Sequence, residues 1–290
     1  NSVDDLRGIF EFVAPGQIDA KMKPRAVGKA VSDFVLRRTK DEVLTDLPPK
    51  LFRDANVVLS AEQAESYRLA EDEGIIHLRE IKQELTIQHV FELVLRLKQI
   101  CNFDPGTGTS TKFERLESDL EECAASGRKA IVFSQWVQTL SELHSRLERF
   151  HPVEYHGKIA SKQRDSVIEK FRDDPNCHVI LMSYGAGSVG LNLQFASYVF
   201  LFDRWWNPAV EDQAINRAHR IGAKQSVTVT RFVTLDTIEQ RIQEILERKR
   251  ELFNTVFTDD IAAPNAGLTR EEIFSLFNLE GGGERGSNAA

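Results

Sequence analysis

Cysteine is scarce in this chain, which has three in 290 residues, and none of them forms a C-x-x-C pair. This scarcity argues against a disulfide framework or a metal site, so we expect Cys101, Cys123 and Cys177 to be buried or incidental thiols. Long apolar runs are also missing. None approaches the ~20 residues that a membrane-spanning helix needs, and no signal peptide is recognisable. These absences predict a cytosolic or nuclear protein.

A basic excess is missing too, because the net charge is −7. That charge argues weakly against a protein that coats nucleic acid, but its distribution is uneven. Residues 21–40 carry seven basic side chains and one acidic side chain. The length, with 41% hydrophobic and 28% charged residues, fits one large globular domain or two of ordinary size.

The pattern of helices and strands changes near residue 111. Before it the chain is mostly helical, with a short strand predicted over residues 57–59 and Ser60 as a helix N-cap. The stretch DPGTGTST at residues 104–111 has the composition of a linker. After it, short apolar strands alternate with helices, which predicts a mostly parallel sheet covered on both faces. The strands are expected at 130–133, 153–155, 178–182, 198–202 and 227–233, and the helices at 136–150 and 161–171.

A glycine pattern follows one of these strands. In the stretch MSYGAGSVGLNLQ, residues 182–194, Gly185, Gly187 and Gly190 spell G-x-G-x-x-G, and Asp203 closes the next apolar run. This is the outline of a dinucleotide-binding turn and admits a nicotinamide-dependent oxidoreductase. Only the seven residues LNLQFAS separate Gly190 from the next strand. A helix of about two turns is too short to run back along a strand, so we disfavour that interpretation.

A polar face is expected in QAINRAHRIG, residues 213–222. On a helix, Gln213, Asn216, Arg217 and Arg220 would fall on one side, opposite a side rich in alanine and isoleucine. Two guanidiniums one turn apart suit a phosphate chain, because each stays charged and offers a planar fork of donors. An ordinary solvated surface explains the segment equally well when it is taken alone.

The order of five segments in the second half of the chain is informative. They are KAIVFSQW (129–136), YHGKIASKQRDSVIEKF (155–171), SYGAGSVGLNL (183–193), FDRWWNPAVEDQAINRAHRIG (202–222) and VTRFVTLDTIEQRI (229–242). In that order they resemble the motifs of the second RecA-like lobe of the Swi/Snf family, the helicase-like, DNA-translocating ATPases of superfamily two. Upstream, FVLRRTKDEVLTDLPPK (34–50) and LRLKQICN (95–102) resemble the family's connecting region, and the likeness covers about residues 1–257.

The resemblance implies an α/β fold with a RecA-like (P-loop NTPase-type), mostly parallel sheet flanked by helices and preceded by a largely helical connector. Together with the residue pattern after position 257, it predicts four parts of the chain. They are the end of the first RecA-like lobe with its exit segment (1–60), the helical connector and linker (61–111), the second lobe (112–257), and a short helix with a flexible tail (258–290).

It also implies roles for single residues. Arg217 and Arg220 would be arginine fingers for ATP, and Gln213 would help to order that site. Contacts to the backbone of double-stranded DNA would come from Ser134 and Gln135, from Ser183, and from the amides around Gly187 and Gly190. Such contacts carry little sequence information, so we expect non-specific, salt-dependent binding.

Some motifs and residues of the family are absent. The chain has no G-x-x-x-x-G-K-[ST] and no Asp-Glu-x-His box, which the first lobe supplies in this family. We therefore expect ATP and Mg²⁺ to act in an intact two-lobe enzyme, with neither bound stably by this chain alone. The usual arginine of the glycine motif is replaced by Gly185, the usual glutamine after Arg-Ile-Gly by Ala223, and the usual His-Pro by Phe103-Asp104.

The sequence thus predicts part of a DNA-dependent ATPase of chromatin remodelling or DNA repair. The first lobe of the same protein would be its partner, in the cytoplasm (nucleoid) of a prokaryote or the nucleus of a eukaryote. A non-enzymatic nucleic-acid-binding or regulatory module is the alternative from another class. A phosphate-loop motif encoded upstream would favour the enzyme.

Overall fold

The computed structural model describes residues 3–19, 21–22, 24–31, 34, 47–81, 84–186, 191–220, 222–223, 225–256 and 268–279. The chain divides into two compact units. One comprises residues 1–47 with 247–266, and the other residues 48–246 with 267–290. Within the described ranges, no helix combines the length and the apolar character that crossing a lipid bilayer requires.

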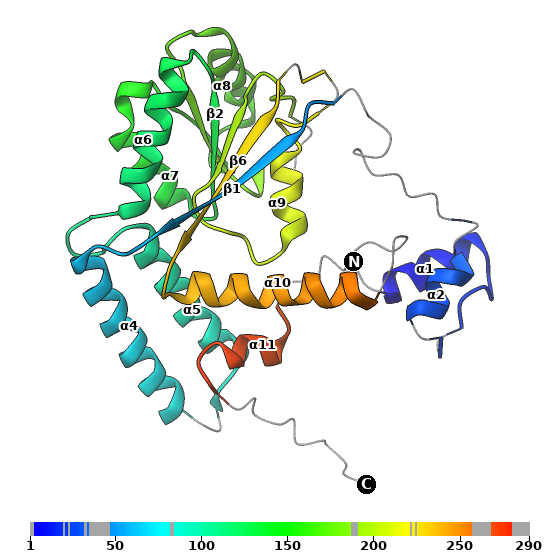
Figure 1. Cartoon of the computed structure of the whole chain (residues 1–290). Coiled ribbons are helices and arrows are strands. Elements are labelled where there is room, and N and C mark those ends of the chain that lie inside the picture. The colour runs from blue at the N-terminus through cyan, green and yellow to red at the C-terminus, as the bar shows by residue number, and fades with distance from the viewer. Residues whose placement is uncertain are drawn as a thin grey trace. The chain divides into compact units, whose positions relative to one another are not determined.

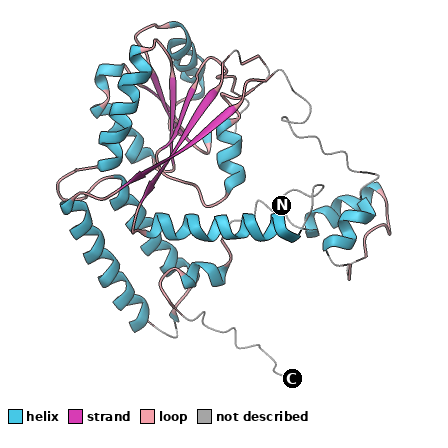
Figure 2. Cartoon of the chain, viewed as in Figure 1, coloured by secondary structure: helices cyan, strands magenta, loops and turns pink. Residues whose placement is uncertain are grey.

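The described part of the larger unit contains a parallel sheet of six strands (Figure 2). Every pair of neighbouring strands runs parallel, in the order β1-β6-β5-β2-β4-β3. The strands are β1 (Lys50–Val57), β2 (Ala130–Ser134), β3 (Val153–Tyr155), β4 (Val179–Ser183), β5 (Tyr198–Leu201) and β6 (Val227–Thr234). Strand β2, inside the sheet, is buried along its whole length because both faces are covered, which explains its continuous apolar run.

Helices lie on both faces of the sheet (Figure 1). Side chains of β2 alternate between them, so that Ile131 and Phe133 pack with α8 (Ser161–Asp173) and α9 (Pro208–Ile215). Ala130 and Val132 pack with α6 (Thr111–Ala125) and α7 (Val137–Arg146). The predicted helix at 136–150 is shorter in the structure, because α7 ends at Arg146 and a 3₁₀ turn, η2 (Glu148–Phe150), follows. The prediction of a parallel sheet covered on both faces is confirmed.

A third set of helices packs together around its own apolar core. It consists of α4 (Ala61–Glu80), α5 (Ile87–Asn102), α11 (Arg270–Ser275) and the part of α10 (Ile238–Val256) that precedes residue 247. The predicted cap is present, since the Ser60 side chain accepts a hydrogen bond from the amide of Gln63. A Cβ on Gly74 would come within 2.2 Å of Leu93, so a glycine at this position lets α4 and α5 approach closely.

The smaller unit contains α1 (Val3–Val13) and α2 (Pro24–Val31), which share a small core of Phe10, Val27 and Val31.

One predicted boundary differs from the structure. Strand β1 lies inside the segment assigned to the first lobe, yet it is hydrogen-bonded along its length to β6. A boundary at residue 60 therefore separates this strand from its own sheet. The strand gave a weak sequence signal because it lies at the sheet edge, where Leu51 and Phe52 stay exposed and Arg53 and Asp54 interrupt the apolar run.

Candidate functional site

Three of the predicted site residues lie at the carboxyl ends of neighbouring strands. Ser134 ends β2 and Gln135 follows it, while Ser183 ends β4 as the register partner of Ser134. The chain then crosses from β4, on one side of β2, to β5 on the other. In open α/β sheets, ligands bind at the carboxyl edge beside such a crossover. The topology therefore places Ser134, Gln135 and Ser183 at an edge suited to binding.

Ser134 and Gln135 are turned toward the protein. Ser134 is fully buried, and its hydroxyl donates to Oδ2 of Asp203 at 2.5 Å. The Gln135 amide donates to Asp203 Oδ1 at 2.9 Å, and its side-chain nitrogen donates to the Arg204 carbonyl at 2.6 Å. The Ser134 side chain is thus inaccessible in this structure, and the predicted DNA contact of Ser134 and Gln135 stays a prediction. The Ser134 hydroxyl holds the loop that Gln135 begins.

Asp203 is balanced by a buried ammonium. Lys98 is 2% exposed, donates to the Arg204 carbonyl at 2.6 Å and lies 4.7 Å from the centre of the Trp206 ring. Burial raises the pKa of the Asp203 carboxyl, and the Lys98 ammonium opposes that shift. Burial lowers the pKa of Lys98, and Asp203 opposes it in turn. The two charges therefore stabilise each other inside the protein.

A second buried ion pair extends this network. Lys112 Nζ lies 2.6 Å from Glu239 Oε1, and both side chains are essentially inaccessible. Lys112 also donates to Asn102, whose amide nitrogen donates to Asp203. The network joins α5, α6 and α10 to the carboxyl edge of the sheet, so one helix of the predicted connector, α5, is bonded directly to the site.

The glycine turn is described only in its first part. Ser183 is partly buried and accepts a hydrogen bond from the amide of Ala186, while Gly185 is exposed. Gly187 and Gly190 lie outside the described residues. Residues 191–197 contain no helix. The helix that a dinucleotide turn opens is missing from that stretch, and Asp203 is buried among protein donors, so the nicotinamide interpretation is wrong.

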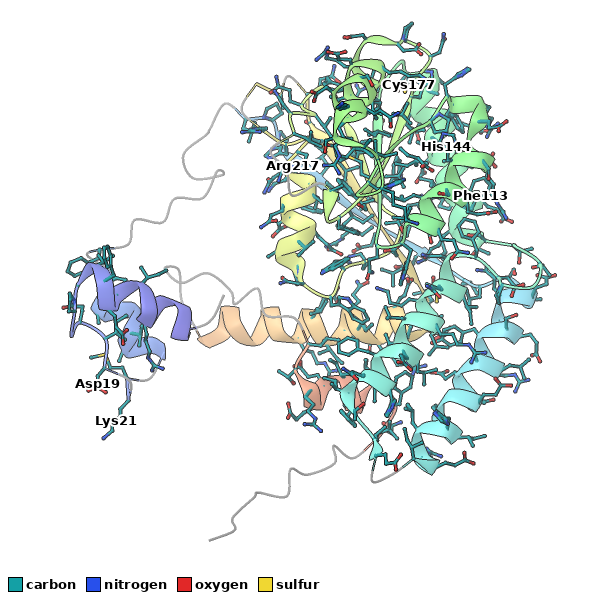
Figure 3. The ribbon with its side chains drawn as sticks, turned by 180° about the vertical axis from the view of Figure 1, so that it is seen from behind. Asp19, Lys21, Phe113, His144, Cys177 and Arg217 are labelled. Carbon is teal, nitrogen blue, oxygen red and sulfur yellow. The ribbon has the colours of Figure 1, made fainter. Side chains whose placement is uncertain are left out.

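The two candidate arginines lie in a turn rather than on a helix. Helix α9 ends at Ile215 with Asn216 as its C-cap, and Ala218 and His219 donate back to the Ile215 carbonyl. Figure 3 shows Arg217 at this end of α9. We call the described residues 216–220 and 222–223 the arginine turn. The helix predicted across 213–222 is thus wrong in its second half, but the exposure pattern agrees: Ala218 is buried, Arg217 is partly buried, and Gln213 and Arg220 are exposed.

The two guanidiniums influence each other electrostatically. Burial lowers the pKa of Arg217, and the positive charge of Arg220 lowers it further. Like charges held together at a surface are favourable where an anion lies between them. The arrangement therefore fits a phosphate group.

The arginine turn is joined to the chain that leaves the glycine turn. The amide of Leu193 donates to the Arg217 carbonyl at 3.1 Å. Gly222 has a φ of +96°, and a Cβ there would lie 2.9 Å from the Gln194 side chain. Both contacts bring residues 193–194 against the arginine turn, which the sequence did not predict.

Sequence reasoning missed three site residues that act through their neighbours. Arg204 and Glu211 form a bidentate pair at 2.7 and 2.8 Å, and Glu211 also accepts from the amide of Trp205. Burial alone would lower the pKa of Arg204, but Glu211 reverses the direction and raises it. The buried imidazole of His219 contacts the Pro48 carbonyl. The tandem tryptophans pack on other aromatic rings, Trp205 on Tyr184 and Trp206 on Phe91.

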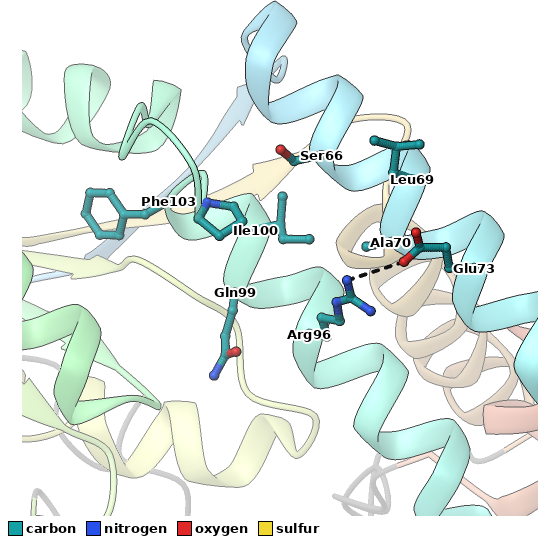
Figure 4. Close-up of a pocket in the computed structure, with 9 residues that line it drawn as sticks. Ser66, Leu69, Ala70, Glu73, Arg96, Gln99, Ile100 and Phe103 are labelled. Carbon is teal, nitrogen blue, oxygen red and sulfur yellow. Dashed lines mark ion pairs between the residues drawn. The ribbon is translucent and has the colours of Figure 1, made fainter.

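Two pockets lie away from these residues. One of about 390 Å³ is formed between α4 and α5, where Arg96 and Glu73 pair at 3.6 Å (Figure 4). A neighbouring pocket of about 340 Å³ shares Gln99 and Phe103 with it. None of the predicted site residues lines either pocket, so neither provides the expected ATP or DNA site.

Two family profiles match the chain. The helicase conserved C-terminal domain matches residues 111–222, and the SNF2-related domain matches residues 3–105. An uncharacterized ATP-dependent helicase of Mycoplasma pneumoniae is 32% identical over 96% of this chain. The DNA repair protein RAD5B of Arabidopsis thaliana is 46% identical over 52% of it. The chain spans only 28% and 12% of the length of these two relatives.

A solved structure supports the same relationship. The SWI2/SNF2 ATPase core of Sulfolobus solfataricus in complex with dsDNA is 29% identical, with a TM-score of 0.63. The match covers 97% of this chain and 65% of that one. The sheet with its flanking helices thus has the RecA-like architecture that the sequence predicted.

Proposed function

The chain belongs to the Snf2 family of helicase-like ATPases of superfamily two, and we propose that it is the C-terminal lobe of an ATP-dependent double-stranded DNA translocase. In this proposal the arginine turn supplies Arg217 and Arg220 to ATP, with Gln213 ordering the site. The carboxyl edge around Gln135 and Ser183 faces the DNA backbone. The proposal concerns the whole protein, of which this chain is the second lobe.

The ATP assignment depends above all on the position of the two arginines. One turn of chain carries both guanidiniums, with Arg217 partly buried and Arg220 exposed, and the charge of Arg220 acts on Arg217 in addition to its burial. A triphosphate bound with Mg²⁺ supplies the group to be transferred and part of the charge neutralisation. The two arginines would stabilise the charge that develops on the phosphoryl oxygens.

The DNA assignment is supported by the exposed part of the glycine turn. Gly185 is exposed beside Ser183, and a relative of similar fold was solved in complex with dsDNA. Backbone amides and small side chains grip phosphates without reading bases. Because Ser134 is buried, we propose that it positions the DNA-facing loop through Asp203 rather than contacting DNA.

The first lobe of the same protein is the proposed partner. It would supply the phosphate-binding loop, the catalytic lysine and the Mg²⁺-binding acids, and translocation would follow from closure and release of the two lobes. The four-part division of the chain and the cytoplasmic or nuclear location remain predictions. A non-enzymatic nucleic-acid-binding module is the competing proposal.

One experiment separates these two proposals. The full-length protein is assayed for ATP hydrolysis with and without linear duplex DNA, and for displacement of a third strand from a triplex as a report of translocation. The translocase proposal predicts DNA-stimulated hydrolysis and ATP-dependent displacement. DNA binding without hydrolysis would instead support the binding module.

A further inference from the structure

His219 lies in the arginine turn, one residue before Arg220 and two after Arg217. Its side chain is buried, with 1% of the residue exposed, although its neighbour Arg220 faces solvent. The ring Nε2 lies 2.7 Å from the carbonyl oxygen of Pro48. A carbonyl oxygen only accepts hydrogen bonds, so Nε2 carries the proton and donates. The proposed function gives this imidazole no role.

Pro48 lies at the junction between the two compact units. The smaller unit ends its first segment at Leu47, and the larger unit begins at Pro48. From there the chain enters the sheet at Lys50, and the Pro49 carbonyl accepts a hydrogen bond from the amide of Val227. The carbonyl that accepts the hydrogen bond from His219 is therefore the first carbonyl of the larger unit.

The junction is stiff where His219 holds it. Proline fixes its own φ near −65°, and the residue before a proline is restricted to extended conformations. Pro48 meets both conditions, because Pro49 follows it. A displacement of the chain at Leu47 is thus poorly absorbed within Pro48 and Pro49, and it reaches the His219 ring through one short hydrogen bond.

The arginine turn has a second attachment on its other side. The Arg217 carbonyl accepts from the amide of Leu193, in the chain that leaves the glycine turn. The turn is consequently fixed between the segment expected to face DNA and the segment that arrives from the other unit. Of these two attachments, only the one through His219 uses a side chain, so it can be removed by substitution.

We propose that His219 is a positioning residue that makes the placement of Arg217 and Arg220 depend on the junction at Pro48. This inference rests on the proposed function. A displacement of the chain at Leu47, where the first segment of the smaller unit ends, would reach the two arginines through the His219 bond. The imidazole does not touch ATP. It sets the position of the two guanidiniums when ATP is bound.

The test compares three substitutions in the full-length protein. Glutamine places an amide nitrogen the same number of bonds from the backbone as Nε2, whereas asparagine falls one bond short. We expect His219→Ala and His219→Asn to lower the DNA-stimulated kcat at least about tenfold, with KM for ATP and Kd for duplex DNA within about twofold. His219→Gln should recover kcat to within about threefold of the unaltered protein. His178→Ala is the matched control, because that ring contacts the Arg128 carbonyl elsewhere in the unit.

An unaltered kcat in His219→Ala would overturn the proposal. It would also be overturned if all three variants lost kcat equally and in proportion to their loss of Tm. Hydrogen exchange of residues 214–223 supplies a readout that does not need ATPase activity. Faster exchange in His219→Ala and His219→Asn, but not in His219→Gln, is expected. Identical exchange in all variants would overturn the proposal. If the unaltered protein shows no DNA-stimulated hydrolysis, the proposed function fails, and exchange still decides whether His219 positions the turn.

Discussion

The amide of Leu193 donates a hydrogen bond to the carbonyl oxygen of Arg217 across 3.1 Å. This bond connects the chain that leaves the glycine turn to the first of the two candidate arginines. Both residues lie at the amino-terminal side of the sheet, since Leu193 precedes β5 and Arg217 precedes β6. Under the proposed function, this bond would link the chain that leaves the DNA-facing glycine turn to the arginine turn, through backbone atoms that no substitution of side chains removes.

Replacing either arginine tests the nucleotide site itself. We expect Arg217→Ala and Arg220→Ala to lower DNA-stimulated ATP turnover of the full-length protein by about 10³-fold or more, because an arginine finger stabilises charge in the transition state. The affinity for duplex DNA should stay unchanged. Arg172→Ala on α8 is a suitable control, since this exposed side chain pairs only with its neighbour Asp173 among the contacts described. Near-normal turnover in both variants would refute the assignment.

Gly222→Ala should destabilise the larger unit. A φ of +96° strains any side chain, and the new Cβ would meet the Gln194 side chain at 2.9 Å. We expect a loss of about 1–3 kcal/mol in the free energy of unfolding, measured with urea. Gly157→Ala is the control, because its Cβ would have no atom within 4 Å and its φ is not positive. Equal stability of the two variants would contradict the described conformation of the arginine turn.

The sheet could be predicted from sequence because its strands are buried on both faces. Runs such as Ala130–Phe133 are apolar without interruption, and turn residues separate them. Strand β1 gave a weak sequence signal for the opposite reason: it lies at the edge of the sheet and carries charged residues. Periodicity reports burial, so it identifies an edge strand poorly.

The geometry of the candidate site differs from the sequence prediction. The order of motifs singled out Arg217 and Arg220 as candidates, yet the helix expected to carry them ends at Ile215. Ala218 is buried in this turn, as it would be on the apolar side of a helix. The apolar pattern therefore cannot distinguish a continuing helix from the turn. The bond from His219 to Pro48 joins residues 171 positions apart, and no local pattern predicts such a pairing.

Lys112→Met should be strongly destabilising. It leaves the Glu239 carboxylate, which is 1% exposed, without its ammonium partner. Breaking a buried pair in this way costs about 3–5 kcal/mol, whereas removing both charges is often neutral. We therefore expect urea denaturation of the double variant Lys112→Met, Glu239→Leu to recover much of the loss. Arg149→Met, at an exposed pair with Glu121, should change stability little. Additive losses in the double variant would contradict this account.

The thiols should be unreactive in the folded protein. Burial raises the pKa of Cys101 and of Cys123 to about 12, and it also raises the pKa of Cys177. At pH 8, thiolate then makes up about one part in 10⁴ of the first two, and burial blocks the reagent as well. We expect an aromatic disulfide reagent to modify none of the three before unfolding and all three in guanidinium. Ser145→Cys, at an exposed position on α7, should add one fast-reacting thiol. Rapid reaction of a native cysteine would show that the core opens locally.

Gly185→Arg tests which surface faces DNA. Gly185 is exposed, its φ is not positive, and an added Cβ would have no atom within 4 Å, so the fold should accept the larger side chain. A guanidinium beside the DNA backbone would bind one more phosphate and release its counterions. We expect tighter binding to duplex DNA at low salt, and a slope of log K against log salt steeper by about 0.9. Gly185→Glu should weaken binding, because it places a negative charge at the same position. If neither variant changes the affinity or the slope, the glycine turn does not face DNA. That result would not affect the assignment of the arginine turn to ATP.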